Sequence, residues 1–202
     1  MQVALSINAH DAVEARDLAL RAPRIVGLRG IVHLDVHDNS FHGVMVPKGV
    51  QTEVHLMAPD WEARLVPWFA AGAFRAAIPA HLMDVHSLRR ACEVAARYGA
   101  AIMPSFAYDD ETTDFSGFVG VGAFQILAVP AGKSGQRFDM RAIQKIKALR
   151  AAFPDAILEV DGGMTPVTAA RAKDAGADIV VSSSCIWGAD SPKEAYDTLF
   201  RI

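Results

Sequence analysis

Short apolar runs recur eight times along this chain with other segments between them, and this alternation limits the possible folds most strongly. The runs are nearly continuous in apolar residues, as expected for strands that are buried on both faces of a parallel sheet. They cover residues 2–8, 30–36, 52–58, 74–80, 100–107, 123–129, 156–162 and 177–183. Parallel strands need long crossover connections, so the intervening segments are expected to be helices that cover the sheet.

Several of these segments carry apolar residues at three- and four-residue intervals, which is typical of amphipathic helices. The clearest helices are expected at 59–71, 84–98, 139–152, 165–175 and 191–201, and the last four have Asp84, Asp139, Thr165 and Ser191 as expected N-caps. Eight units of a strand followed by a helix predict an α/β fold, the closed (β/α)8 TIM barrel. An open doubly wound sheet is the alternative, and the regular spacing of the strands favours the barrel.

The chain is short for such a barrel, and the shortage lies after the second strand. The fifteen residues DNSFHGVMVPKGVQT (38–52) contain two Gly and one Pro and show no helical period. The second helix of the barrel is therefore expected to be reduced to a loop. Residues 108–122 are also a poor helix, because they are acidic at the start and Gly-rich at the end.

The composition favours a single globular domain without a nucleic-acid partner. With 202 residues, 51% of them hydrophobic, the chain can bury one core, and a single barrel domain over residues 1–202 is expected. Twenty basic and 23 acidic residues give a net charge of −3 without a basic stripe, so no nucleic-acid partner is expected. We find neither a signal peptide nor an apolar run of about 18 residues, which predicts a cytoplasmic protein without a membrane partner.

The two cysteines, Cys92 and Cys185, are far apart and show no C-x-x-C spacing. A disulfide framework or a cysteine-based zinc site is therefore not expected. Both residues are predicted to be buried thiols.

Four metal-competent side chains lie near the C-terminal ends of predicted strands. His33 and Asp35 close the second strand, His55 comes late in the third, and Asp161 ends the seventh. Two imidazoles and two carboxylates suit one divalent ion such as Zn²⁺, Fe²⁺, Mn²⁺ or Co²⁺. Each residue alone could be a core histidine or a capping aspartate, but four at equivalent heights in a barrel indicate a site.

The two carboxylates also suggest a reaction. Strands two and seven lie on opposite sides of the barrel mouth, so Asp35 and Asp161 are expected to face each other across it. A substrate carbon between them could lose a proton on one face and regain one on the other. A metal held by the same residues would polarise an adjacent carbonyl.

The loops after the last three strands are candidates for phosphate binding, because barrels of this type often bind phosphate there. Glycines let the backbone approach an anion, and serines supply N–H and hydroxyl donors. The candidates are Gly132, Lys133, Ser134, Gly135, Gly162, Gly163, Ser183 and Ser184.

In this order the segments resemble those of the ribulose-phosphate 3-epimerase family, whose members are phosphate-binding TIM barrels. LSINAHD (5–11) is similar to P-S-I-L-S-A-D, IVHLDVHDNSF (31–41) to H-x-D-V-M-D-G-x-F, and VHLMAPD (54–60) to V-H-L-M-V-x-D. ILAVPAGKSGQRF (126–138) is similar to V-M-T-V-N-P-G-F-G-G-Q-K-F. EVDGGMTPVTAARAKDAGADIVVSSSCIWG (159–188) contains counterparts of E-V-D-G-G-V, A-G-A-D and A-G-S-A-I-F.

The resemblance implies a metal-dependent isomerase that interconverts D-ribulose 5-phosphate and D-xylulose 5-phosphate by inverting carbon 3 through an enediolate. It implies that His33, Asp35, His55 and Asp161 hold one catalytic divalent metal and that Asp35 and Asp161 are the acid/base pair. Ser6 corresponds to the family's active-site serine, and Met57 to a methionine that faces the substrate. The glycine loops would bind the phosphate, and a homo-oligomer, a dimer or larger, is expected.

The chain departs from the family pattern around the same site. His37 replaces a methionine, Leu127 another methionine, and Lys133 a phenylalanine, while Ser134 and Ser183 replace glycines. His37 and Lys133 are candidate additional contacts, with solvated loop side chains as the alternative.

These departures leave other functions open: an epimerase or lyase for a different ketose phosphate, or a non-catalytic sugar-phosphate binder on the same barrel. A D-x-K-x-x-D pattern, typical of decarboxylase relatives, is absent from the sequence.

Overall fold

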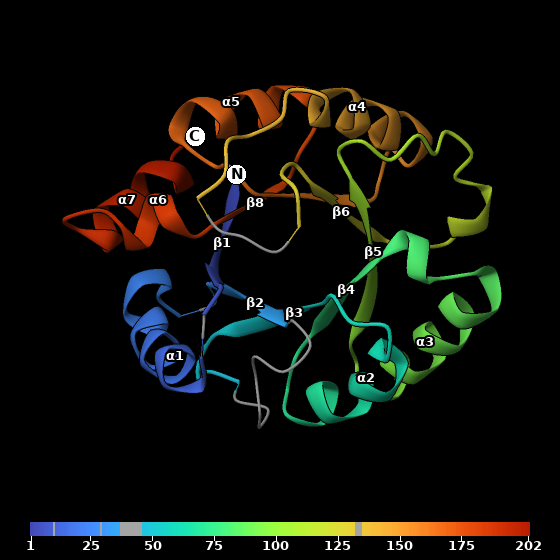
Figure 1. Ribbon diagram of the computed structural model, residues 1–202, viewed down its shortest axis with the longest axis horizontal. Coiled ribbons are helices and arrows are strands. Elements are labelled where there is room, and N and C mark those ends of the chain that lie inside the picture. Colours follow the sequence, from blue (N-terminus) through green and yellow to red (C-terminus); the bar gives the residue numbers. More distant parts are fainter. Residues whose placement is uncertain (10, 29, 37–45, 132–134) are drawn as a thin grey trace.

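The computed structural model is a closed barrel of parallel strands surrounded by helices (Figure 1). It describes residues 1–9, 11–28, 30–36, 46–131 and 135–202. Each strand pairs with its neighbours in the sequence, and β1 also pairs with β8, which closes the sheet. The strands are β1 (Gln2–Ile7), β2 (Ile31–Val36), β3 (Gln51–Leu56), β4 (Arg75–Pro79), β5 (Ala101–Ala107), β6 (Ala123–Leu127), β7 (Ile157–Asp161) and β8 (Ile179–Ser182). The prediction of a (β/α)8 TIM barrel is confirmed.

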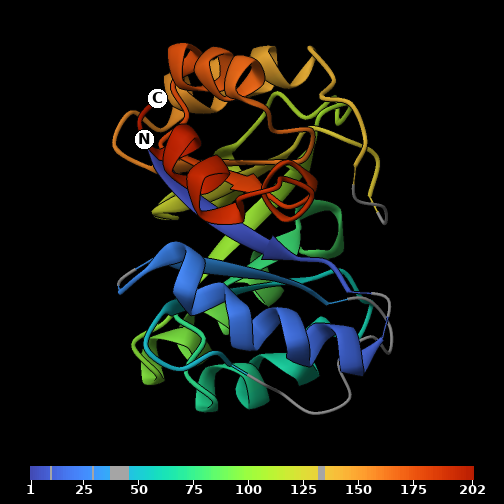
Figure 2. The same ribbon diagram turned by 90° about the vertical axis from the view of Figure 1, so that its left-hand side faces the viewer.

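Helices surround the barrel, and both termini lie at the same end of it (Figures 1 and 2). They are α1 (Ala12–Val26), α2 (Trp61–Ala70), α3 (Val85–Arg97), α4 (Ala142–Ala152), α5 (Pro166–Ala175), α6 (Ser184–Trp187) and α7 (Pro192–Phe200), with the 3-10 turns η1 (Ala80–Leu82) and η2 (Ser116–Phe118). Within the described ranges, no helix combines the length and apolar character that a membrane span requires.

Three of the four predicted N-caps are confirmed. Asp84 and Thr165 form capping boxes with the third residue of their helices, and Ser191 accepts a hydrogen bond from the backbone N–H of Glu194. The prediction for Asp139 is wrong, because α4 begins three residues later and the Asp139 carboxylate instead accepts from the backbone N–H of Arg141. The Asp139 carbonyl accepts from Ala142 N–H, so this residue forms the turn that precedes the helix.

The described part of the connection between β2 and β3 agrees with the expected loss of the second helix. Of the residues between β2 and β3, the structure describes 46–50, and these form a turn without a helix. Residues 108–122, all of them described, contain η2 and no α-helix, as their composition predicted.

Figure 1 shows an irregular segment where a helix is expected after β5, and aromatic side chains of this segment pack on the strand. Phe115 and Phe118 from the connecting segment pack edge-to-face on Phe106 of β5. Nζ of Lys145 donates a hydrogen bond to the carbonyl of Thr112 over 2.9 Å and so ties the segment to α4. Large aromatic rings thus exclude water from the outer face of these strands without a helix.

The apolar core lies mainly between the sheet and the helices, whereas much of the barrel interior is polar. Two small apolar clusters, one around Ile31 and one around Met103, occupy the interior. The remaining inward positions include buried polar side chains: Ser6, His33, Asp35, Glu53, His55, Arg75, Ser105, Gln125 and Glu159. Buried polar groups are costly without partners, so this interior must pair its own charges or bind a ligand.

The prediction of buried thiols is wrong for both cysteines. Cys92 is exposed and Cys185 is partly exposed. Helix α3 buries Ser87, Leu88, Ala91 and Ala95, and Cys92 lies at the edge of this buried face, about 100° around the helix from Ala91.

Candidate active site and metal centre

The four predicted ligands meet inside the barrel. His33 and Asp35 project from β2, His55 from β3 and Asp161 from β7, and one ligand atom of each lies within 4.8 Å of those of the others. The β2–β3 register places Asp35 beside His55. Alternate residues of a strand share a face, so His33 and Asp35 both point inward.

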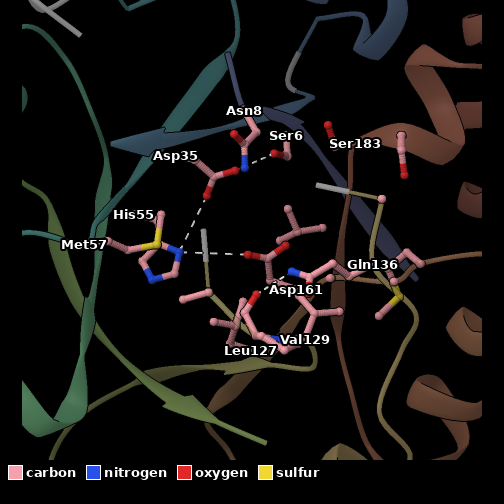
Figure 3. A pocket seen from close by; sticks show the side chains of 18 residues that line it. Ser6, Asn8, Asp35, His55, Met57, Leu127, Val129, Gln136, Asp161 and Ser183 are labelled. Atoms are coloured by element: carbon pink, nitrogen blue, oxygen red, sulfur yellow. Dashed lines mark hydrogen bonds and ion pairs between the residues drawn. The ribbon is translucent and has the colours of Figure 1, made fainter. Parts of the chain in front are cut away.

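The spacing within this cluster suits a bound cation. Nε2 of His33 lies 3.4 Å from Oδ1 of Asp35 and 3.9 Å from Oδ2 of Asp161. Nδ1 of His55 lies 3.7 Å from Oδ1 of Asp35 and 3.9 Å from Oδ2 of Asp161, and Figure 3 shows both carboxylates pointing toward this ring. Ligand atoms about 2.1 Å from a tetrahedral cation lie roughly 3.4 Å apart, which is close to these separations.

The polar atoms of the cluster also favour a cation. Nε2 of His33 is buried and makes no hydrogen bond of good geometry among the described residues, although Oδ1 of Asp35 lies 3.4 Å away. Such atoms are rare in folded proteins, and a cation would satisfy this one. Two imidazole nitrogens with two carboxylate oxygens fit Zn²⁺, Fe²⁺, Mn²⁺ or Co²⁺, so the cluster is consistent with a divalent metal site.

The electrostatic environment separates the two carboxylates. Burial and then the negative charge of Asp35 raise the pKa of Asp161 to about 7. Burial also acts to raise the pKa of Asp35, but hydrogen bonds and positive charge from His33 and His55 outweigh it and hold that pKa well below its usual range. Burial acts to lower the pKa of His33, but the adjacent carboxylates of Asp35 and Glu53 outweigh it and raise this pKa well above its ordinary value. Near neutral pH, and without a cation, Asp35 is therefore ionised and Asp161 is partly protonated.

Hydrogen bonds fix the orientation of Asp35. Ser6 Oγ donates to Oδ2 of Asp35 over 2.9 Å, which leaves Oδ1 facing the imidazoles. Nε1 of Trp187 donates to the Ser6 carbonyl over 2.8 Å, so the chain after β8 supports the end of β1.

A pocket opens above the cluster, and most of the predicted substrate-binding residues line it. Of that set, the lining includes Ser6, Met57, Gly135, Gly162, Gly163, Ser183 and Ser184. The predicted contacts His37, Gly132, Lys133 and Ser134 lie outside the described residues. Asn8 and Gln136, which the sequence analysis did not select, also line the pocket (Figure 3).

The glycine pair after β7 has a packing reason to be glycine. Gly162 and Gly163 have φ values of +99° and +67°, which side chains rarely adopt. A Cβ on Gly162 would lie 2.4 Å from Cγ2 of Val129, and one on Gly163 would lie 2.3 Å from the backbone nitrogen of Phe138. The glycines therefore let the loop after β6 pack closely against the loop after β7, where both line the pocket.

Beneath the cluster lies a buried polar layer that the sequence analysis missed. The guanidinium of Arg75 on β4 bonds to Glu53 on β3 and to Glu159 on β7. Gln125 donates to Oε1 of Glu159 over 3.1 Å, and Ser105 Oγ donates to Oε1 of Gln125 over 2.6 Å. The two-residue period of the strands could have predicted this layer. Glu53 and Glu159 precede His55 and Asp161 by two residues, so each points into the barrel from the same face of its strand.

Comparison with known proteins gives the following matches. The model of the "Ribulose-phosphate 3 epimerase family" matches residues 2–187. A ribulose-phosphate 3-epimerase of Mycobacterium bovis is 25% identical over 209 residues, which cover 94% of this chain and 90% of the relative. The cytoplasmic isoform of ribulose-phosphate 3-epimerase from Oryza sativa subsp. japonica is 39% identical over 74 residues, or 37% of this chain and 32% of the relative.

Solved structures share the fold at lower identity. The 3-hexulose-6-phosphate synthase of Salmonella typhimurium superposes with a TM-score of 0.71 at 15% identity, over 100% of this chain and 97% of that chain. A KGPDC structure from Streptococcus mutans superposes with a TM-score of 0.69 at 14% identity, over 100% of this chain and 98% of that chain. At these sequence identities the structural matches establish the barrel fold and nothing about function.

Proposed function

The chain belongs to the ribulose-phosphate 3-epimerase family, and we propose that it is a metal-dependent isomerase that inverts carbon 3 of a ketose phosphate. The proposed substrate pair is D-ribulose 5-phosphate and D-xylulose 5-phosphate. One observation carries the proposal: Asp35 and Asp161 reach one pocket from β2 and β7, and their pKa values are shifted in opposite directions. Inversion next to a carbonyl needs such a pair, one group to remove a proton and one to supply it.

In the proposed reaction the ionised carboxylate of Asp35 removes the proton from carbon 3, which produces an enediolate. Asp161, in its protonated state, delivers its proton to the opposite face of that carbon. The reverse reaction exchanges the two roles. The hydrogen bond from Ser6 keeps one oxygen of Asp35 in a fixed direction throughout.

The proposed ligands of the divalent cation are His33, Asp35, His55 and Asp161. When bound, the cation would polarise the substrate carbonyl and stabilise the negative charge of the enediolate. The proposed reaction needs no organic cofactor.

Four of the proposed phosphate-binding residues line the pocket beside the two aspartates. Gly162 and Gly163 bring backbone atoms to the surface of the pocket, and Ser183 and Ser184 add N–H and hydroxyl donors. Met57 and Leu127 line the pocket near His55 and offer apolar contact to the sugar carbons (Figure 3). Leu127 stands where the family pattern has methionine, so a related ketose phosphate is the alternative substrate.

The test is a substrate panel with the metal-loaded protein. D-ribulose 5-phosphate and several other ketose phosphates are incubated with the protein, and epimer formation is followed by NMR. The proposal predicts conversion of D-ribulose 5-phosphate to D-xylulose 5-phosphate at the highest kcat/KM of the panel. If another ketose phosphate is converted faster, that compound becomes the proposed substrate. If the metal-bound protein converts none of them, the proposed activity is wrong.

A further inference from the structure

Each of the two ring nitrogens of His33 faces carboxylates, but in different surroundings. Nε2 faces Asp35 and Asp161 in the cluster. Nδ1 lies on the other side and is 2.8 Å from Oε1 of Glu53, a normal hydrogen-bond distance. Both side chains are 0% exposed, so water does not compete for this bond.

Glu53 is in turn held in place and kept ionised. Nε of Arg75 donates to Oε2 of Glu53 over 2.8 Å, and Nη2 bonds to the same oxygen. This arrangement leaves Oε1 to accept from His33. The guanidinium of Arg75 is a permanent positive charge in contact with Glu53, and this buried ion pair favours the ionised carboxylate. An ionised carboxylate can only accept, so Nδ1 of His33 must carry the proton.

The same arginine connects opposite walls of the barrel. Nη2 of Arg75 lies 2.8 Å from Oε2 of Glu159 on β7, two residues before Asp161 and on the same face of the strand. Gln125 fixes the other oxygen of Glu159. The layer thus links β3 and β7, the strands that carry His55 and Asp161, directly beneath the cluster.

We propose that Glu53, fixed by Arg75, is a positioning residue that holds His33 in the tautomer and orientation in which Nε2 faces the metal centre. The inference rests on the proposed metal site and deepens it. Histidine ligands commonly donate their second N–H to a carboxylate, which orients the ring and increases its basicity. Here the carboxylate is itself fixed by a guanidinium, so the ring has one orientation before the metal binds.

The alternative use of this layer is a second metal site, since His33, Glu53 and Glu159 also lie within 4.8 Å of one another. Arg75 argues against it, because its guanidinium already occupies the space between the two glutamates. A cation placed there would face a full positive charge at contact distance. The layer therefore orients a ligand of the upper site and is not a site of its own.

The test compares Glu53→Gln with Thr52→Val in the metal-free protein. Glutamine keeps the size of Glu53 and removes its charge, and its amide can present N–H groups to His33, which disfavours the required tautomer. Thr52 is the preceding residue, it is 1% exposed, and its hydroxyl has no partner in the described part of the chain, so valine is a matched control. The readouts are the dissociation constants for Zn²⁺ and Co²⁺, measured by competition with a chromophoric chelator.

We expect Glu53→Gln to weaken metal binding roughly 10- to 100-fold, the usual effect of losing such a partner, and Thr52→Val to bind as the wild type does. Equal affinity in wild type and Glu53→Gln would overturn the inference. The visible spectrum of the Co²⁺ protein should also change in Glu53→Gln, because a reoriented imidazole alters the ligand geometry. A purely structural role would change the melting temperature of the metal-free protein without these two signals.

A measurement on the wild type covers the case in which Glu53→Gln does not fold. In the Zn²⁺-loaded protein, long-range ¹H–¹⁵N NMR should show His33 with a protonated Nδ1 and a metal-bound Nε2, and with slow exchange of the Nδ1 proton. A protonated Nε2 on His33 would overturn the inference.

Both tests are independent of turnover. A protein that binds metal in this way and fails to epimerise any sugar phosphate would refute the proposed function and leave the role of Glu53 intact.

Discussion

Asp35 and Asp161 approach the same two imidazoles from strands β2 and β7, with Oδ1 of Asp35 3.4 Å and Oδ2 of Asp161 3.9 Å from Nε2 of His33. Because Asp35 receives the hydrogen bonds of this group, its pKa falls, whereas burial and the charge of Asp35 raise that of Asp161 to about 7. Two identical side chains thus obtain different protonation states from their positions.

The raised pKa of Asp161 predicts how the stability of the metal-free protein depends on pH. The ordinary pKa of an aspartate is 3.8, and that of Asp161 in the folded protein is about 7, so between about pH 4 and pH 7 the folded state holds a proton that the unfolded chain has lost. The free energy of unfolding should therefore fall as the pH rises through this window. In Asp161→Asn the slope should be shallower by up to about 1.4 kcal/mol per pH unit.

Urea denaturation of the metal-free proteins at half-unit pH steps measures these slopes. Asp155→Asn, at an exposed position, is the control and should keep the wild-type slope. An identical slope in wild type and Asp161→Asn would show that Asp161 does not hold the extra proton.

Removal of the divalent metal should abolish turnover and lower the melting temperature. A ligand at 100 times its dissociation constant stabilises the folded state by about 2.7 kcal/mol, so saturating Zn²⁺ or Co²⁺ should raise the melting temperature of the chelator-treated protein measurably. His55→Ala should lose this increase. Ser105→Ala is the control, because the buried Ser105 hydroxyl bonds to Gln125 and to none of the four clustered side chains. This variant should keep the metal-dependent increase in melting temperature. The same metal-dependent shift in His55→Ala would place the metal elsewhere.

Replacing Gly162 by alanine should lower the stability more than replacing a glycine that has free space around its Cα, because a Cβ at Gly162 would overlap a neighbouring side chain. At Gly162 the new Cβ would meet Val129 at 2.4 Å, whereas at Gly120, which also has a positive φ of +88°, nothing lies within 4 Å. Gly120→Ala should cost about 1 kcal/mol from the backbone alone, and Gly162→Ala should cost roughly 1–3 kcal/mol more, the usual penalty of overpacking. Chemical denaturation of both variants measures the difference, and equal losses would mean that the loops are not packed as described.

Arg75 should be among the most sensitive positions outside the cluster. Its removal in Arg75→Met leaves the buried carboxylate of Glu53 without its guanidinium partner and Glu159 without a hydrogen-bond donor, and breaking a buried pair of this kind costs about 3–5 kcal/mol. Arg90→Ala removes an exposed ion pair with Glu62 and should cost about 0–1 kcal/mol. Adding Glu53→Gln and Glu159→Gln to Arg75→Met should recover part of the lost stability. A loss in Arg75→Met as small as that in Arg90→Ala would show that the layer is not charged as described.

The sequence predicts the features that depend on local patterns. Nearly continuous apolar runs locate both ends of all eight strands to within two residues, and the polar residues in these runs, such as Asp35 and Asp161, identify the mouth of the barrel. The Gly-rich character of residues 108–122 is likewise local and predicts the missing helix. Asp139 shows the limit of such patterns, because a carboxylate near a helix start can serve an earlier turn equally well.

The features that the sequence does not predict are those that arise from contacts between distant strands. Arg75 meets Glu53, its register partner on the adjacent strand, from 22 residues away. Its contact with Glu159, 84 residues away on β7, exists only because the barrel closes. From the sequence alone, Arg75 in FRAAIPA is expected to be a solvent-exposed arginine at the start of a strand. The aromatic cover over β5 and β6 has the same origin, since Phe115 can replace a helix only where Phe106 faces it.

The most direct test of the central claim is solvent-deuterium incorporation at carbon 3. Metal-loaded wild type and Asp35→Asn are incubated with D-ribulose 5-phosphate in D₂O, with bound metal measured in both, and the sugars are followed by proton NMR. We predict D-xylulose 5-phosphate that carries deuterium at carbon 3 with the wild type, and neither product nor exchange with metal-bound Asp35→Asn. Product that retains protium at carbon 3, or normal turnover by Asp35→Asn, would contradict the proposed roles of the two aspartates.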